Sequence, residues 1–432
     1  GTIKITNEES GIEIPINQSF FNYLDQSAMI GEGLYLKAGE SLKTPLLAEN
    51  FVNSPNTDSN TDSGTDTEDG TEVTTETSAE TTEAASISLI IDADTDTNAG
   101  TGERCSFSGL IGNMAAGTKL TLSVVNNITD NGKTKISGTG NLGFFCNTME
   151  AGASLTIKSY TGDTGYTVST ENGHAGGLVG EMKSEATLTV TPDLTLEGSV
   201  QTKGEKYAAG GLVGKVDTPE IILTGKVTCR ETISASDNDT SVGGFIGNAV
   251  FFKETKSLDF SNLNVQAALG DGSHTGGLFG VLNFDCMTGG TLTLSNATSV
   301  TPAFQGSNWQ SGGLIGQYTA NSLKSTLSIP SSRVTITHNG SAASFGGVIG
   351  FIAGTDAESA LSNATAAYVE INGATVSVNA ASSYSSSSDS RFGGLVAEMS
   401  KEGHFLSVSG NVSIASIASN EDSENDGSLD IG

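Results

Sequence analysis

The sequence is poor in several residue types, and each shortage excludes a class of protein. Its 432 residues include 7 prolines, 1 tryptophan and 4 cysteines, and 20 basic residues stand against 49 acidic ones. There is no apolar run of about 18 residues, so no membrane-spanning helix is predicted. Glycine does not recur at every third residue, so the chain is not collagen-like. A net charge of −29 repels nucleic acid and anionic lipid, so we expect neither nucleic-acid binding nor direct membrane insertion.

The four cysteines are too scattered for a disulfide framework or a zinc knuckle. They leave two interpretations, namely four small buried hydrophobic side chains or one disulfide between adjacent layers of the fold, and spacing does not decide between them. The chain begins at Gly1 without a charged-then-apolar leader, which we expect of a mature or excised segment. The cysteines are Cys105, Cys146, Cys229 and Cys286.

Glycine, in contrast, is abundant, with 55 residues, and much of it belongs to a repeat. The pattern Gly-Gly-apolar-apolar-Gly occurs at 176–180 and 210–214 and returns four more times, with three degenerate copies at the two ends of the series. Successive copies are 33 to 36 residues apart, except for a final spacing of 47. Such self-similarity is typical of a repeat fold. The second residues of the nine copies are Gly109, Gly143, Gly177, Gly211, Gly244, Gly277, Gly313, Gly347 and Gly394.

Most repeat units also contain a short stretch in which apolar and polar residues alternate. Examples are 155–157 and 188–190, and several units carry a third stretch such as 334–336. Alternation with β-branched residues between Gly, Asn, Asp and Ser turns predicts strands, and no 3.6-residue apolar period competes with it. We therefore predict an all-β fold, a right-handed parallel β-solenoid of about nine coils of roughly 34 residues. Stacked at about 4.8 Å per coil, it would form a rod on the order of 40 Å long.

The apolar residues of the motif indicate how each coil is packed. Large, small and large residues follow one another along one strand face, which predicts an inward face that closely approaches the opposite wall. A second column points to the other face and is apolar throughout. Either a second layer covers it, or it forms an exposed stripe used for lateral association. This column is Ile111, Phe145, Val179, Val213, Ile246, Phe279, Ile315, Ile349 and Val396.

The flanks of the repeat differ from it in composition. Residues 1–105 are expected to form an N-terminal capping β region, because an open solenoid end exposes unpaired strand edges. Within it, about 54–84 is an acidic Ser/Thr-rich insertion that is predicted to be disordered. The solenoid is predicted to span 106–418, and 419–432 is an acidic tail.

The repeat resembles the GLUG motif, which occurs in tandem in large bacterial surface and secreted proteins. The resemblance rests on Gly-Gly-Leu-Val-Gly at 176–180 and 210–214 and covers roughly residues 105–415. The first two copies and the last depart from the pattern at Ser108, Leu142, Cys146 and Ala397. The resemblance implies a β-solenoid stalk or adhesin-type module outside the cell. It brings no catalytic residue with it.

Candidate catalytic groups are sparse. In the outward positions of the second strand of each unit we count only two acids, Asp259 and Glu370, which are three coils apart and too distant for paired acid and base work. His174 and His274 precede the Gly-Gly turn by the same offset, again three coils apart, and are expected to be turn residues. We therefore expect no enzyme activity, and a carbohydrate-active β-helix enzyme stays as a secondary alternative.

Two candidate binding sites remain. Asp92, Asp94 and Asp96, with Glu103 at the twelfth place, match the ligand spacing of a calcium loop, although Thr97 replaces the usual glycine; the alternative is a solvated turn. No other cofactor is predicted.

Trp309 lies in a long predicted turn that starts at Pro302, and together with the Ser-rich loop at 382–390 it is a candidate for ligand contact. Packing of Trp309 into the core is the competing interpretation.

These observations favour a structural or adhesive module at the bacterial cell surface or outside the cell. A rigid stalk would present variable loops to a protein or carbohydrate partner. The main alternative is self-association into an extracellular filament, in which strands at 2–5 and 12–14 pair with the open end of the next protomer.

Overall fold

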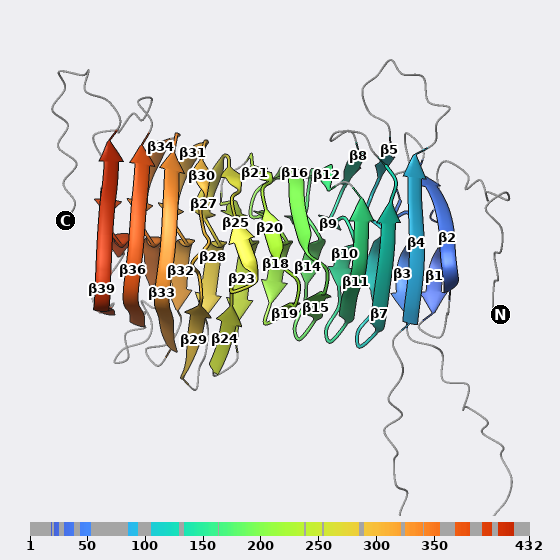
Figure 1. Cartoon of the computed structure of the whole chain (residues 1–432), viewed down its shortest axis with the longest axis horizontal. Coiled ribbons are helices and arrows are strands. Elements are labelled where there is room, and N and C mark those ends of the chain that lie inside the picture. Colours follow the sequence, from blue (N-terminus) through green and yellow to red (C-terminus); the bar gives the residue numbers. More distant parts are fainter. Residues whose placement is uncertain are drawn as a thin grey trace, which may run out of the picture.

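The computed structural model shows a right-handed parallel β-solenoid whose strands stack along one axis (Figure 1). The described residues form strands β1 to β39, and none of them forms a helix, hence none that is long and apolar enough to cross a membrane. The predicted fold class is confirmed. The residues that the structure describes are 19, 21–25, 30–38, 44–52, 85–93, 105–128, 134–162, 164–236, 239–252, 255–284, 289–320, 325–339, 341–354, 368–380, 391–399 and 405–418.

Wall A is an 11-stranded parallel sheet that runs the length of the described solenoid. The nine strands that follow the glycine motif lie in it in sequence order, as predicted. Two further strands, β1 and β3, continue the same sheet at the N-terminal end, so part of the predicted cap region is built as wall. The strands are β1 (Phe21–Asp25), β3 (Ala48–Val52), β6 (Ile111–Met114), β10 (Cys146–Met149), β14 (Val179–Met182), β18 (Val213–Asp217), β23 (Ile246–Phe251), β28 (Phe279–Phe284), β32 (Ile315–Ala320), β35 (Ile349–Gly354) and β38 (Val396–Met399).

Wall D is an 8-stranded parallel sheet that immediately precedes wall A in each coil. Its strands end on the first motif glycine, and the next two residues make a bend into wall A. The strands are β9 (Leu142–Gly143), β13 (Ala175–Gly176), β17 (Ala208–Gly210), β22 (Ser241–Gly243), β27 (Gly272–Gly276), β31 (Ser307–Gly312), β34 (Ser341–Gly346) and β37 (Arg391–Gly393).

Wall B is built from the second strand of each coil. Its first six strands form a sheet of their own, and the later ones belong to the largest sheet. The first set is β2 (Ile30–Ala38), β4 (Ala85–Ala93), β7 (Lys119–Asn126), β11 (Ser154–Gly162), β15 (Thr187–Val190) and β19 (Glu220–Leu223). The second set is β24 (Thr255–Asp259), β29 (Gly290–Ser295) and the N-terminal halves of β33 (Ser325–His338), β36 (Tyr368–Ala380) and β39 (Phe405–Ala418).

Wall C holds the third strand of each coil and is continuous from β5 to β39. In the last three coils one long strand serves both wall B and wall C. The shorter strands of wall C are β5 (Cys105–Phe107), β8 (Thr134–Gly138), β12 (Gly165–Thr170), β16 (Leu194–Thr202), β20 (Val227–Cys229), β21 (Thr232–Ala235), β25 (Leu263–Val265), β26 (Ala268–Leu269) and β30 (Ala303–Phe304).

The motif glycines are required because three backbones meet at the corner between walls D and A. In one coil, a Cβ on Gly276 would lie 2.0 Å from the carbonyl oxygen of Phe279 in its own corner. A Cβ on Gly277 would lie 2.1 Å from the carbonyl oxygen of Gly313 in the next coil, and one on Gly280 would lie 2.6 Å from that of Gly247 in the preceding coil. The motif is therefore steric in origin.

The second apolar column of the motif is buried in the core, so the exposed-stripe interpretation is wrong. Val179, Ile315 and Ile349 are fully buried, and the ring of Phe279 lies 6.1 Å from that of Phe260 beside wall B. The bend at the corner interrupts the strand alternation, so both apolar residues of the motif point inward. No second layer is needed to cover them.

The pairing register corrects the sequence alignment at one copy. Gly143 pairs with Gly176, and Cys146 pairs with Val179. Gly143 therefore occupies the place of the first motif glycine, and Cys146 stacks on the second apolar residue of the next coil. The acidic segment 54–84 and the tail 419–432 lie outside the described residues.

Candidate functional site

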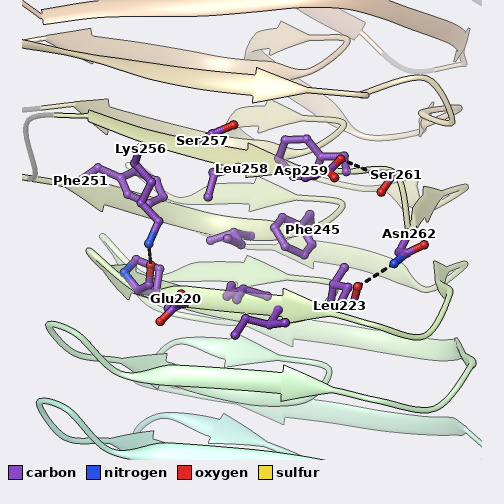
Figure 2. A pocket seen from close by; sticks show the side chains of 15 residues that line it. Glu220, Leu223, Phe245, Phe251, Lys256, Ser257, Leu258, Asp259, Ser261 and Asn262 are labelled. Atoms are coloured by element: carbon purple, nitrogen blue, oxygen red, sulfur yellow. Dashed lines mark hydrogen bonds between the residues drawn. The ribbon is translucent and has the colours of Figure 1, made fainter.

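The most distinctive feature of the solenoid is a seam in wall B between β19 and β24. Both strands stand at the ends of their sheets, while walls A, C and D continue past them. Nearly all Cα–Cα distances between β19 and β24 exceed 8 Å, whereas paired strands are about 4.8 Å apart. The seam opens into a cleft of about 260 Å³ (Figure 2).

Two side chains bridge the seam, one at each end. The ammonium of Lys256 donates a hydrogen bond to the carbonyl oxygen of Pro219, and the Nδ2 of Asn262 donates to that of Leu223 at 2.7 Å. These bonds show that alternate carbonyls of β19 point into the seam. Side chains here replace the backbone ladder that joins other neighbouring coils (Figure 2).

Lys256 occupies a position that is apolar in the neighbouring coils. It pairs in register with Leu292, which pairs in turn with Leu327, and both leucines are fully buried. A charged side chain in this inward column cannot complete the core, because an ammonium without partners is costly to bury. Its extension across the seam to Pro219 satisfies the charge.

The floor of the cleft is apolar. Ile221, Leu223 and Leu258 face inward but are only partly buried, unlike their counterparts in neighbouring coils. Behind them lie the rings of Phe245 and Phe260, whose centroids are 5.7 Å apart in an edge-to-face arrangement. The cleft thus offers an apolar interior between two strand edges.

The corners between walls A and B differ in length on the two sides of the seam. The inward residue of wall B follows that of wall A by six positions in one coil (Met182 to Leu188), by five in the coil of β19 (Val216 to Ile221) and by seven in the coil of β24 (Ala249 to Lys256). Corner length alone does not open the wall, because the corners of β24 and β29 differ by three positions (Ala249 to Lys256 and Leu282 to Leu292) and these two strands still pair. Lys256, a charged residue in an inward column, was the sequence signal for the seam, and our sequence reasoning missed it.

Trp309 lies on wall D, in strand β31, and not in a turn. Its side chain is 64% exposed, so packing in the core is also excluded. The predicted turn before it is largely wall, since Pro302 and Phe304 are buried and Ala303–Phe304 forms β30. A strand holds the indole more rigidly than a loop would. The Ser-rich loop at 382–390 lies outside the described residues.

The two histidines stand three coils apart in one ladder of wall D, with Ala208 and Ser241 between them. The Nδ1 of His174 accepts a hydrogen bond from the backbone N–H of Ala208 at 3.1 Å, and burial lowers the pKa of His174 to about 4. Burial also lowers the pKa of His274. Both imidazoles are structural parts of the wall, and nothing in this geometry brings them together.

The structure corrects the outward column of wall B. Ser257, and not Asp259, pairs with Thr293 in this column. In the preceding coil the outward position is occupied by Ile222, which pairs with Thr189. Asp259 accepts hydrogen bonds from Asn296 and from the backbone of Ser261, which lower its pKa. Asp259 and Glu370 belong to strands three coils apart, so no carboxylate pair forms there.

The candidate calcium ligands are largely beyond what the structure describes. Asp92 belongs to β4, while Asp94, Asp96 and Glu103 lie outside the described residues. Within the described ranges, no cluster of three or more His, Cys, Asp and Glu side chains is placed to hold a metal ion.

A buried polar cluster in the core was not predicted. Glu231 is 1% exposed, and neither of its carboxylate oxygens has a hydrogen-bond partner among the described residues. Burial raises its pKa well above the usual range, as it does for the nearby thiol of Cys229. The hydroxyl of Tyr166 donates to the carbonyl of Gly177 at 2.9 Å, and a Cβ on Gly177 would approach the Oε1 of Glu231 to 2.7 Å.

Two of the four cysteines are free thiols buried in the core, Cys146 and Cys229. Burial raises the pKa of Cys146 to about 12, so it is an inert hydrophobic side chain. This agrees with the interpretation of small buried residues for these two. Cys286 lies outside the described residues.

Comparison of the chain with protein-family models, with curated proteins and with solved structures gives no significant match. The resemblance of the repeat to the GLUG motif therefore stays a resemblance, carried by the residues of the motif alone.

Proposed function

We propose that the chain is an extracellular structural and adhesive module, a rigid stalk that presents side chains and loops to a partner. The observation that carries this proposal is the unbroken wall A. Eleven strands hydrogen-bonded at every step span about 48 Å at about 4.8 Å per step. A continuous ladder of this kind resists bending and holds its surface features at fixed spacings, as a stalk requires.

The best candidate for a contact residue on this stalk is Trp309. It is the only tryptophan of the chain, and it projects from a strand of wall D. Its neighbour in the strand of the preceding coil is Ser273, which is too small to cover an indole. An exposed, rigidly held aromatic ring suits contact with a carbohydrate face or an apolar protein patch.

Two measurements test this proposal. Antibodies against the protein should label intact cells of its source, and protease treatment of those cells should remove the label; a protein found only after lysis contradicts the extracellular role. On arrays of polysaccharides and extracellular proteins, binding should fall at least tenfold in Trp309→Ala. Tyr23→Ala, at an exposed aromatic of wall A, is the matched control and should bind as the native protein does.

A filament subunit is the second candidate, favoured by the C-terminal end of the solenoid. Among the described strands, the last one, β39, pairs only with β36. Its core-column side chains are partly open to solvent, with Leu406 at 36%, Val408 at 45% and Ile414 at 38% exposure. A second copy stacked on this end would cover them and continue the sheets. The segments 2–5 and 12–14 lie outside the described residues.

Sedimentation velocity distinguishes the filament from the monomeric stalk. A filament subunit should sediment faster as concentration rises, and Leu406→Asp with Val408→Asp should abolish this dependence because charges cannot be buried in the contact. A native protein that remains monomeric at high concentration removes this candidate and leaves the stalk proposal intact.

A further inference from the structure

We propose that the seam between β19 and β24 binds one extended peptide segment as an added strand that completes wall B. The occupant is a partner segment with alternating apolar and polar side chains. This inference goes beyond the stalk role and does not depend on where the protein works.

The first argument is the width of the seam. Insertion of one strand requires two strand spacings, about 9.6 Å, between the flanking strands. Nearly all Cα–Cα distances between β19 and β24 exceed 8 Å, while β19 pairs normally with β15 on its other side. Figure 2 shows β24 standing off from β19 with the apolar floor visible between them. The opening is therefore wider than one strand spacing, as an inserted strand requires.

The second argument is the set of backbone groups that face the seam. The N–H groups of Glu220 and Thr224 bond to the preceding coil at 2.9 and 3.0 Å, so the N–H and C=O of Ile221 point the other way, into the seam. On the opposite edge, the N–H of Phe260 bonds to Ser295 at 3.0 Å in the following coil, so the N–H and C=O of Ser257 point into the seam. A guest strand would meet donors and acceptors on both sides.

The third argument is the side-chain environment. Ile221, Leu223 and Leu258 leave apolar surface open toward the seam, so alternate guest side chains would be aliphatic and the others would face solvent. Lys256 and Asn262 donate hydrogen bonds to the carbonyl oxygens of Pro219 and Leu223. The backbone amides of a guest strand would donate to these oxygens instead. Binding would thus exchange two side-chain hydrogen bonds for a backbone ladder, which is the mode of strand addition at sheet edges.

The probe for this site is a capped synthetic peptide with the sequence of residues 185–191, which includes strand β15 and has the required alternation. Fluorescence anisotropy of the labelled peptide with the whole protein should show saturable binding. The same peptide N-methylated at its Leu and following Thr amides should bind at least tenfold more weakly, since it lacks a donor for each edge.

Ser257→Pro tests the protein side. It removes the N–H that faces the seam while leaving the bonds of β24 to β29 in place, and proline is tolerated at such an edge. We expect at least a tenfold loss of peptide affinity. Ser257→Thr keeps the N–H and should bind within about twofold of the native protein; circular dichroism and a thermal melt confirm that both variants are folded.

Hydrogen exchange reports directly on the amides at the two edges of the seam, so it distinguishes strand addition from a general change in stability. The amides of Ile221 and Ser257 should exchange fast in the free protein and slow down when the peptide is bound. Amides in 187–190 and 291–295, paired within wall B, should be protected in both states. No saturable binding up to about 1 mM peptide, binding insensitive to N-methylation and to Ser257→Pro, or binding without protection of both edges would each overturn the proposal.

Discussion

At the scale of single residues, Glu231 is the least expected side chain of the structure. Its carboxyl lies in the core without a partner among the described residues, so the charged form is strongly disfavoured and the acid stays protonated well above the pH at which an exposed glutamate ionises. Wall C continues through this coil on both sides of Glu231, with β20 before it and β21 after it. The solenoid tolerates the acid only in its neutral form.

This burial predicts a pH dependence of stability. The unfolded chain releases the Glu231 proton as pH rises through about 4.5, whereas the folded chain keeps it. The contribution of Glu231 to the free energy of unfolding should therefore be most favourable below pH 4.5 and should fall by up to about 1.4 kcal/mol per pH unit above it, until the folded pKa is reached. Glu231→Gln, neutral at every pH, should remove this slope and be more stable than the native protein at pH 7.

Urea denaturation between pH 4 and pH 8 measures the effect. The native protein and Glu231→Gln should differ little at pH 4 and diverge as pH rises. Glu220→Gln, at an exposed position, serves as the control and should follow the native profile. Parallel profiles for all three proteins would show that Glu231 ionises freely in the folded state.

At the scale of the element, the corner between walls D and A determines how coils stack. A Cβ on Gly177, Gly244 or Gly313 would meet the carbonyl oxygen of the next coil at 2.1 to 2.3 Å, and such a backbone atom cannot move aside as a side chain can. The apolar pair between the glycines points inward, and wall A then resumes normal alternation. In the five-residue motif, the glycines therefore allow the tight bend, and the two apolar residues supply two columns of core side chains.

Gly277→Ala should be strongly destabilising, by about 3 kcal/mol, because its Cβ would meet the Gly313 carbonyl of the next coil. Gly138→Ala is the matched control, since a Cβ there has no neighbour closer than 3.6 Å, and it should change stability by less than about 0.5 kcal/mol. Urea unfolding of the two variants checks both values. Equal effects would mean that the corner relaxes and the close approach is not required.

At the scale of the whole molecule, the seam divides the solenoid into two stacks of coils. A repeat protein is stabilised by the interfaces between neighbouring units, and the interface between the coils of β19 and β24 is the one in which wall B contributes no ladder. Walls A, C and D still join the two stacks, so the rod is continuous (Figure 1). We expect this interface to be the weakest in the described solenoid.

Hydrogen exchange in low denaturant should accordingly reveal two cooperative units that divide between residues 223 and 255. Amides of walls A and B before the division should exchange with one free energy of opening, and those after it with another. Mass spectrometry of proteolytic fragments resolves the two groups. A single free energy for the core amides on both sides of β19 and β24 would contradict this division.

The sequence by itself determined the stacking of the motif strands, because a constant period and recurrent glycines leave one way to bury the apolar columns. It also indicated three strands per coil. It did not reveal wall D as a separate sheet, because two- and three-residue strands such as β9 and β17 have no alternation long enough to recognise.

Only the tertiary structure decided where single side chains point and where the wall breaks. Trp309 is exposed because it takes an outward place in the alternation of β31. The Val179 column is buried because the corner bend interrupts strand alternation, which a sequence pattern assumes to continue. The seam separates two strands that are far apart in sequence, since β19 ends at Leu223 and β24 begins at Thr255. Local residue preferences fix the coil, but contacts between coils determine the width of the gap between them.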